Sequence, residues 1–519
     1  MRFILILIVT AACGLIGAQT RPPAPHEPAY GVYVGDTARR VIVTGRVINA
    51  PPEELGKLVY MVAGVAPLTS EQVPAKGTVG ADGVFTVELT GGYPLREIWF
   101  GLGDLFYGTA FVRAGLTLTF DYAQLVTNPN NRYVHPGLTF GGPDAELAGY
   151  RARQVKTQLL SNEDFFQVVN ERGPDPLTKL SMMDSVLAEL RAVDATVLAA
   201  APADVRTILE AETTTAYFAI GCVLFWQNGD PPAAWRTAYL AHRPPALSNR
   251  GRDFYKYYTK LEQAAVASQL AERFPRQDQS EAATLARTRQ FLRYVDSRYA
   301  PGRADVLRLY LKEKDPLTHY GVLELAEATA TVPWVRRTLR RQLERRRAEV
   351  DALRSALATT VVLGAPAGLG EPLGRTPFGA ELYRVAAGTS GRELLDRLRG
   401  AFPAASLYTD LWATWCSPCI GELPFSAKLH EAAAGLPLRF VYLCTDQGGS
   451  EERWRRLIAA DRVPGVHLYV PASTHAELMK LCLAEGYPTY RLLLPGGGMD
   501  VIERPSRLDR QQLADLLPR

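Results

Sequence analysis

The spacing of hydrophobic residues changes along the chain, and each change predicts a new structural region. Between residues 38 and 135, short runs of β-branched and aromatic residues are separated by Gly, Pro and Asp turns. This rhythm is typical of an antiparallel β-sandwich, which we expect as the N-terminal domain. The predicted strands span residues 41–48, 58–62, 83–89, 98–100 and 116–120.

Between residues 144 and 359, apolar residues recur instead at intervals of three and four positions. That spacing places them on one face of an α-helix, and prolines between the periodic segments mark the ends of the helices. We therefore expect an all-α middle domain. Its clearest helices span residues 185–200, 205–226, 255–274, 280–299 and 332–357.

The last part of the chain alternates between strand-like and helix-like patterns, which predicts an α/β domain from 386 to 519. A Gly- and Pro-rich stretch at 360–385 precedes it and predicts a hinge. The expected order is a helix at 392–398, a strand at 407–412, a helix at 420–434, a strand at 440–444, a helix at 451–460, two strands at 490–494 and 501–503, and a helix at 508–517.

The first 18 residues have the features of a secretory signal peptide. One cation, Arg2, precedes a short apolar run, small residues follow it, and no stop-transfer charges come after them. We expect cleavage after Ala18, followed by a Pro-rich linker at 19–37. The alternative is a lipobox ending at Cys13, which would leave a lipidated, membrane-anchored protein. Either form places the protein in the periplasm or cell envelope.

The composition favours several folded cores and gives no indication of nucleic-acid binding. Of 519 residues, 47% are hydrophobic and 22% charged, and the formal net charge is only +4. The arginines between 336 and 347 share a helix with acidic residues, so we expect a solvated face or a contact with an acidic partner or lipid headgroups. Cys222 lies in an apolar run and is expected in a core, while Cys444 and Cys482 suggest no disulfide framework.

The chemistry is concentrated in residues 411–424, where two residues separate Cys416 from Cys419. A strand runs into this pair and a helix runs out of it, which is the context of a redox CxxC motif. At the start of the helix, unpaired backbone N–H groups and the helix dipole favour the thiolate of Cys416, the expected nucleophile. Cys419, one turn further on the same face, is placed to resolve a mixed disulfide.

The cysteine pair could instead bind zinc or act as a purely structural disulfide. A zinc site would need further Cys or His ligands at suitable spacing, and the sequence has none. A purely structural disulfide would not require the Trp before the pair or the Pro inside it. We expect no metal and no cofactor.

Residues 412–424, with the sequence WATWCSPCIGELP, resemble the signature of the TlpA-like branch of the thioredoxin superfamily, the exported thiol-disulfide oxidoreductases. The resemblance covers residues 392–517, about a quarter of the chain, and implies a thioredoxin fold there. Asp410 matches the buried acid that helps to move the proton of the resolving thiol. Glu422 matches the acid that marks the TlpA-like branch, and Pro424 matches the proline that kinks the active-site helix.

Residues 486–489, Gly-Tyr-Pro-Thr, match the cis-proline loop of the same family. That loop packs beside the disulfide and offers its backbone to an extended substrate. If Asp410 and Glu422 are buried, loss of solvation raises their pKa and makes either a general acid or base near neutral pH. The residues expected to bind substrate are Trp415, Pro418, Tyr487 and Pro488.

The predicted function is an exported thiol-disulfide oxidoreductase that exchanges the Cys416–Cys419 disulfide with cysteines of other envelope proteins. The resemblance implies the reducing direction, with an upstream thiol-disulfide partner. An alternative is an envelope binding or scaffold protein in which the redox domain is accessory. A peroxidase of the peroxiredoxin type is a third possibility, although the proline and threonine usual ahead of a peroxidatic cysteine are missing at Cys416.

Overall fold

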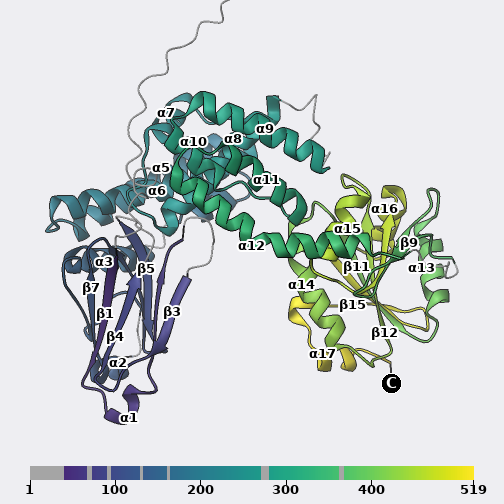
Figure 1. Ribbon diagram of the computed structural model, residues 1–519, viewed down its shortest axis with the longest axis horizontal. Helices are drawn as coiled ribbons and strands as arrows, with labels where there is room; N and C mark the ends of the chain where they lie inside the picture. Colours follow the sequence, from purple (N-terminus) through teal and green to yellow (C-terminus); the bar gives the residue numbers. More distant parts are fainter. Residues whose placement is uncertain are drawn as a thin grey trace, which may run out of the picture.

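The computed structural model describes residues 40–66, 73–89, 95–128, 132–160, 164–269, 280–361 and 368–518. The predicted signal peptide, the linker at 19–37 and Cys13 lie outside these residues. In chain order, the described part contains two small β-sheets, a helical region and a larger sheet flanked by helices (Figure 1). The molecule is therefore multidomain, with a helical middle region between sheet domains.

The N-terminal region consists of two four-stranded sheets and two short helices. One sheet contains β4 (Val84–Leu89), β1 (Val41–Ile48), β7 (Leu116–Asp121) and β8 (Leu138–Gly141), in that order. The other contains β3 (Val73–Thr78), β2 (Val59–Gly64), β5 (Arg96–Leu102) and β6 (Phe106–Val112). The helices are α1 (Pro52–Leu55) and α2 (Tyr122–Thr127).

Buried residues of both N-terminal sheets, including Val43, Phe100 and Leu118, belong to one hydrophobic cluster. Buried and exposed residues alternate along β1, as they do in a strand with one face toward a core. β1 and β7 are parallel neighbours, unlike the antiparallel pairing predicted. Hydrophobic periodicity does not reveal this difference, because side chains alternate in both kinds of pair. β8 also extends the sheet past the predicted end at residue 135.

The helical region contains more helices than the sequence predicts. Several of them begin at a proline, which fits the first turn because the N–H that proline lacks would be unpaired there. Its helices are α3 (Ala145–Leu160), α4 (Phe165–Asn170), α5 (Pro176–Val197), α6 (Ala203–Asn228), α7 (Ala233–Ala241), α8 (Asn249–Gln269), α9 (Glu281–Arg298), α10 (Pro301–Arg308), α11 (Pro316–Thr329) and α12 (Pro333–Ala358).

α6 is the core helix of this region. It is long and apolar enough to cross a membrane, but 72% of its most apolar window is buried inside the protein. Most residues from Tyr217 to Phe225 belong to one hydrophobic cluster with residues of α5, α8 and α9. Cys222 is fully buried among them, as the sequence predicts.

The C-terminal region is a seven-stranded sheet with helices on both faces. Its elements are β9 (Glu371–Arg375), β10 (Ala380–Arg384), α13 (Gly391–Ala401), β11 (Ser406–Ala413), α14 (Ser417–Ala432), β12 (Leu438–Thr445), α15 (Glu451–Ala460), β13 (Gly465–Val470), α16 (Ala472–Leu481), β14 (Thr489–Leu493), β15 (Met499–Val501), the short 3-10 helix η1 (Pro505–Arg507) and α17 (Arg510–Asp515). The strand order is β15-β14-β11-β12-β13-β10-β9. β11 is parallel to β12 and antiparallel to β14, which is the thioredoxin-like arrangement that the sequence predicts.

The stretch predicted as a hinge, 360–385, contains β9 and β10 instead. β10 pairs in parallel with β13 and so extends the sheet by two strands. Gly370, Gly374 and Gly379, which suggested a loop, have positive φ angles that L side chains rarely adopt. Here the glycines lie in or next to two short strands, of which β9 forms the edge of the sheet.

The helical region and the C-terminal domain share an interface formed by α11, α12 and α15. Figure 1 shows α12 running from the helical region to the C-terminal sheet. At this interface, Arg456 of α15 donates a hydrogen bond of 3.0 Å to the carboxylate of Asp315, the N-cap of α11. Arg456 also pairs with Glu281 at 2.8 Å. Arg456 and Asp315 are both buried, so this ion pair joins the two regions away from solvent.

We predict that Arg456→Met destabilises the protein by about 3 kcal/mol, because breaking a buried ion pair leaves the other charge unpaired. Asp315 keeps the hydrogen bonds from Leu317 and Thr318, so the loss stays at the lower end of the usual range. Denaturant unfolding followed by circular dichroism measures the change. The control is Asp351→Ala, which breaks a pair whose side chains are 61% and 62% exposed and should change stability by less than about 0.5 kcal/mol. Equal effects would contradict the role given to Arg456.

Candidate redox site

β11 positions the candidate site and is buried along its full length. Its neighbours β12 and β14 pair with it on both edges, and helices cover both faces of the sheet. Side chains along a strand alternate between faces. Tyr408 and Trp412 belong to the core that contains the cysteine pair, whereas Leu407 and Leu411 belong to the opposite core. Asp410 therefore faces the cysteine side of the sheet.

The cysteine pair lies where β11 ends and α14 begins. Cys416 is the N-cap of α14, and its Sγ accepts a hydrogen bond of 3.2 Å from the backbone N–H of Cys419. Pro418 occupies the first turn, where its missing N–H breaks no helical bond. The two cysteines form a disulfide, with their Cα atoms 5.3 Å apart. Cys416 is 5% exposed and Cys419 1%, so the predicted nucleophile is the more exposed residue of the two.

An aromatic pair stands beside the disulfide. Trp415 is exposed, and its ring packs edge-on against Tyr487 with centroids 5.5 Å apart. The Tyr487–Pro488 peptide bond is cis, as the resemblance implies. Thr489 lies opposite Leu411 in the ladder between β14 and β11, so Pro488 is level with the end of β11. The structure therefore places the loop predicted to contact substrate beside the cysteines.

His475 of α16 supports Tyr487, and no sequence pattern predicts this role. Its Nε2 lies 3.0 Å from the carbonyl oxygen of Leu443, and its Nδ1 lies 3.1 Å from the hydroxyl of Tyr487. A carbonyl oxygen only accepts, so Nε2 carries the proton and the Tyr487 hydroxyl donates to Nδ1. Burial lowers the pKa of His475, which favours this neutral ring. Only the fold brings His475 to the motif, so sequence spacing gives no indication of it.

Asp410 is a buried acid with no compensating contact. Its side chain is 1% exposed, and within the described residues neither carboxylate oxygen has a hydrogen-bond partner. Burial, together with the nearby charge of Glu422, raises the pKa of Asp410 well above its ordinary value. A carboxyl group with a raised pKa keeps its proton at a higher pH than an ordinary aspartate and can exchange it with a neighbouring group.

Glu422 is buried in a different environment from Asp410. Its carboxylate accepts hydrogen bonds of 2.9 Å from the backbone N–H and from the hydroxyl of Ser506. Arg504 lies 3.7 Å away. These contacts tie α14 to η1 and leave Asp410 as the better candidate for moving a proton. Ser506, far from the motif in sequence, was not predicted as a partner.

The remaining cysteines of the described chain are buried and unpaired. They are Cys222, Cys444 and Cys482. Burial raises the pKa of each thiol, which disfavours the reactive thiolate. Within the described residues, the redox chemistry therefore belongs to Cys416 and Cys419.

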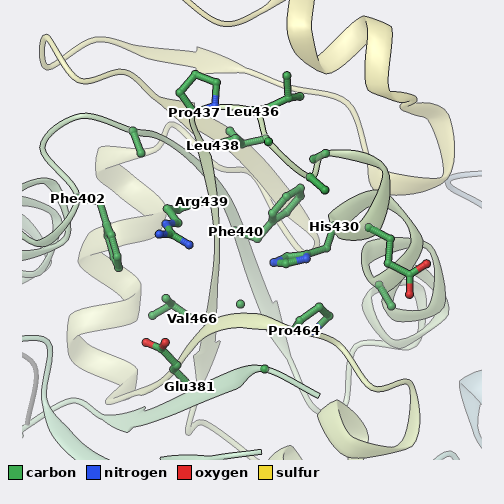
Figure 2. Close-up of a pocket in the computed structure, with 18 of the residues that line it drawn as sticks. Glu381, Phe402, His430, Leu436, Pro437, Leu438, Arg439, Phe440, Pro464 and Val466 are labelled. Carbon is green, nitrogen blue, oxygen red and sulfur yellow. The ribbon is translucent and has the colours of Figure 1, made fainter. Parts of the chain in front are cut away.

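A hollow of about 1080 Å³ lies elsewhere on the C-terminal domain (Figure 2). Its walls include His430 near the end of α14, Leu438 at the start of β12 and Val466 at the start of β13. Parallel strands have their amino ends at the same edge of a sheet, whereas the cysteine pair follows the carboxyl end of β11. The hollow is therefore at the opposite edge from the disulfide, and none of the predicted site residues lines it.

Solved structures that resemble part of this chain include thiol-disulfide oxidoreductases. A proposed thiol-disulfide oxidoreductase from Bacteroides vulgatus is 33% identical over 21% of this chain and 70% of its own, with a TM-score of 0.19. A thiol:disulfide interchange protein from Bacteroides sp. is 21% identical over 30% of this chain and 86% of its own, with a TM-score of 0.21. StoA from Bacillus subtilis is 22% identical over 22% of this chain and 81% of its own, with a TM-score of 0.18. No protein-family model and no curated protein matches.

We predict that Asp410→Asn stabilises the protein above neutral pH. Because folding raises the pKa of Asp410, the folded state holds a proton that the unfolded chain has already released. Stability is therefore lost as pH rises from the unfolded pKa, about 3.9, through the folded pKa. At pH ~8 the variant should be more stable by on the order of 1–3 kcal/mol, and the gain should shrink toward pH ~4.

Hydrogen exchange of the β11 amides in the oxidised protein measures this gain locally. Glu422→Gln is the control, because that side chain already has partners and the substitution should give no such gain. A gain for Asp410→Asn that is the same at both pH values would show that the buried charge is not its cause.

Proposed function

We propose that this chain is an exported protein-disulfide oxidoreductase of the TlpA-like kind, acting on cysteines of proteins in the periplasm or cell envelope. The observation that carries the proposal is the junction of β11 and α14, which holds a disulfide at a helix N-terminus beside an exposed aromatic pair and a cis-proline loop. Residues 412–424 support the TlpA-like assignment, and the composition of residues 1–18 supports export. Lipidation of Cys13 would add a membrane anchor.

The proposed direction is reduction of a partner's disulfide. The Cys416 thiolate attacks one partner sulfur, the partner's S–S bond breaks, and the second partner sulfur leaves as a thiolate that takes up a proton. The Cys419 thiol then loses its proton and attacks Cys416, which releases the first partner sulfur. The partner gains two electrons and two protons, and the Cys416–Cys419 disulfide forms again. An upstream dithiol partner is needed to reduce it for the next cycle.

The site residues have separate roles in this scheme. The helix N-terminus favours the thiolate of Cys416, because the unpaired N–H groups of the first turn and the dipole stabilise negative charge. Asp410 takes the proton of the Cys419 thiol, since a buried carboxyl with a raised pKa is a suitable base near neutral pH. Glu422 holds α14 against η1 through Ser506.

Substrate binding is proposed for the residues around the disulfide that face solvent. Trp415 and Pro418 are exposed, and Tyr487 and Pro488 are partly exposed. An extended segment of a partner protein can lie along the 486–489 loop, where backbone groups give contacts that do not depend on its sequence. This arrangement favours a range of protein substrates over one small molecule.

A second function, binding of an envelope partner by the rest of the chain, is favoured by one surface. α12 exposes arginines along one helix, two of which pair with Glu327. Such a face fits an acidic protein or anionic lipid headgroups. In this alternative, the redox domain assists a scaffold. The exposed arginines of α12 are Arg336, Arg337, Arg340, Arg341, Arg345, Arg347 and Arg354.

We predict that Cys419→Ser traps partner proteins on Cys416. Without its resolving thiol, the mixed disulfide with a partner cannot be cleared from within, so it should accumulate as adducts on non-reducing gels. Reduction of insulin disulfides by the unsubstituted protein, in the presence of a dithiol, should be lost in this variant. Cys416→Ser is the matched control and should form few adducts. If both variants trap partners equally, the assignment of nucleophile and resolver is wrong.

A further inference from the structure

The loop between α10 and α11 extends from the helical region to the redox site. Lys314 of this loop donates a hydrogen bond to the hydroxyl of Ser417, and its Nζ lies 3.4 Å from the Ser417 carbonyl oxygen. Ser417 directly follows Cys416 and is the first residue of α14. We propose that Lys314 is a positioning residue of the redox site, whose positive charge favours the thiolate of Cys416 after the disulfide is reduced. This inference rests on the function proposed above.

The position of Lys314 is fixed by its neighbours. The next residue, Asp315, caps α11 and forms the buried ion pair with Arg456. Close by, Nε of Arg453 in α15 donates a hydrogen bond of 3.3 Å to the carbonyl oxygen of Thr414, two residues before Cys416. Asp315 thus anchors the loop to α15 at the residue next to Lys314. The contacts with Ser417 then hold the Lys314 ammonium at the start of α14.

Other charged groups near this junction come from several elements. Asp315 and Arg456 form an ion pair, and the negative charges of Glu313 and Asp315 act on Arg453. Burial raises the pKa of Asp410, so it carries less negative charge at a given pH than an exposed aspartate would. His475 is neutral, since burial lowers its pKa. These groups include Arg453 and Arg456 of α15 with Glu281 and Glu452, which pair with Arg456, and also Glu313, Lys314 and Asp315 of the loop, Lys260 of α8, Arg287 of α9, Asp410 of β11, Glu422 of α14, Asp446, and His475 of α16.

Lys314 therefore adds positive charge at the N-terminus of α14. Among the groups named above, no acid forms a direct ion pair with it. A nearby opposite charge stabilises an ionised thiol in the same way as the helix dipole does. Lys314 is itself exposed to solvent, so its effect is partly screened. We expect Lys314 to lower the pKa of the Cys416 thiol by about half to one unit, which is less than the shift that a buried charge pair causes.

The test uses the full chain with Cys419→Ser, in which Cys416 is the reactive thiol of the site. The rate of Cys416 alkylation by iodoacetamide, measured against pH, gives its thiol pKa, because the thiolate displaces iodide. Adding Lys314→Met should raise that pKa by about half to one unit and slow alkylation below the pKa about three- to ten-fold. The shift should shrink at about 1 M salt. Lys314→Arg, which keeps the charge, should restore the lower pKa.

Lys312→Met is the matched control, since Lys312 is exposed on the same loop but faces Lys256 and Arg346. It should leave the Cys416 pKa unchanged. An unchanged pKa in Lys314→Met, or an equal shift in Lys312→Met, would overturn the inference. Insulin reduction by the unsubstituted chain distinguishes the proposed function from the role of Lys314. If insulin is reduced but Lys314→Met leaves the Cys416 pKa unchanged, only the role of Lys314 fails. If insulin is not reduced and no mixed disulfides form, the proposed function fails.

Discussion

The redox site depends on how the sheet holds β11. β11 is buried at every position, and its hydrogen bonds to β12 and β14 fix it on both edges. A strand held in this way places its carboxyl end at one defined point, and α14 begins there. Cys416 caps that helix, and the disulfide to Cys419 spans its first turn. The geometry of the site thus comes from the sheet, because a flexible loop would not hold the helix N-terminus in one position relative to the Cys416 sulfur.

The fixed strand also explains why an acid without partners is kept in the core. Asp410 lies on the cysteine face of β11, between Tyr408 and Trp412, where water is excluded. Burying a carboxyl group without a hydrogen bond is unfavourable, so a residue of this kind in a well-packed sheet calls for a chemical reason. Moving the proton of a thiol is such a reason. Glu422 shows the contrast, since Ser506 supplies the contacts that Asp410 lacks.

The sequence predicts the parts of the site that are close together in the chain. The CxxC pair, the strand before it and the helix after it are local, and their resemblance to a known motif adds Asp410, Glu422 and the 486–489 loop. His475 could not be predicted, because its contact with Tyr487 depends on how α16 packs on the sheet. β9 and β10 were missed for a different reason. Glycines at positive φ occur in loops as well as in short irregular strands, and only the pairing of β10 with β13 shows that this stretch belongs to the sheet.

The interface between the two regions gives the helical region a direct contact with the redox site. Asp315 and Arg456 hold the end of the loop that carries Lys314. The ion pair between the two regions therefore also places a positive charge at the N-terminus of α14. Lys314 of this loop contacts Ser417, while Trp415, Ser417 and Pro418 remain exposed. The exposed side of the disulfide is therefore the one formed by Trp415, Pro418 and the 486–489 loop. In the role proposed for Lys314, the helical region supplies a charge at the start of α14 that a redox domain alone would lack.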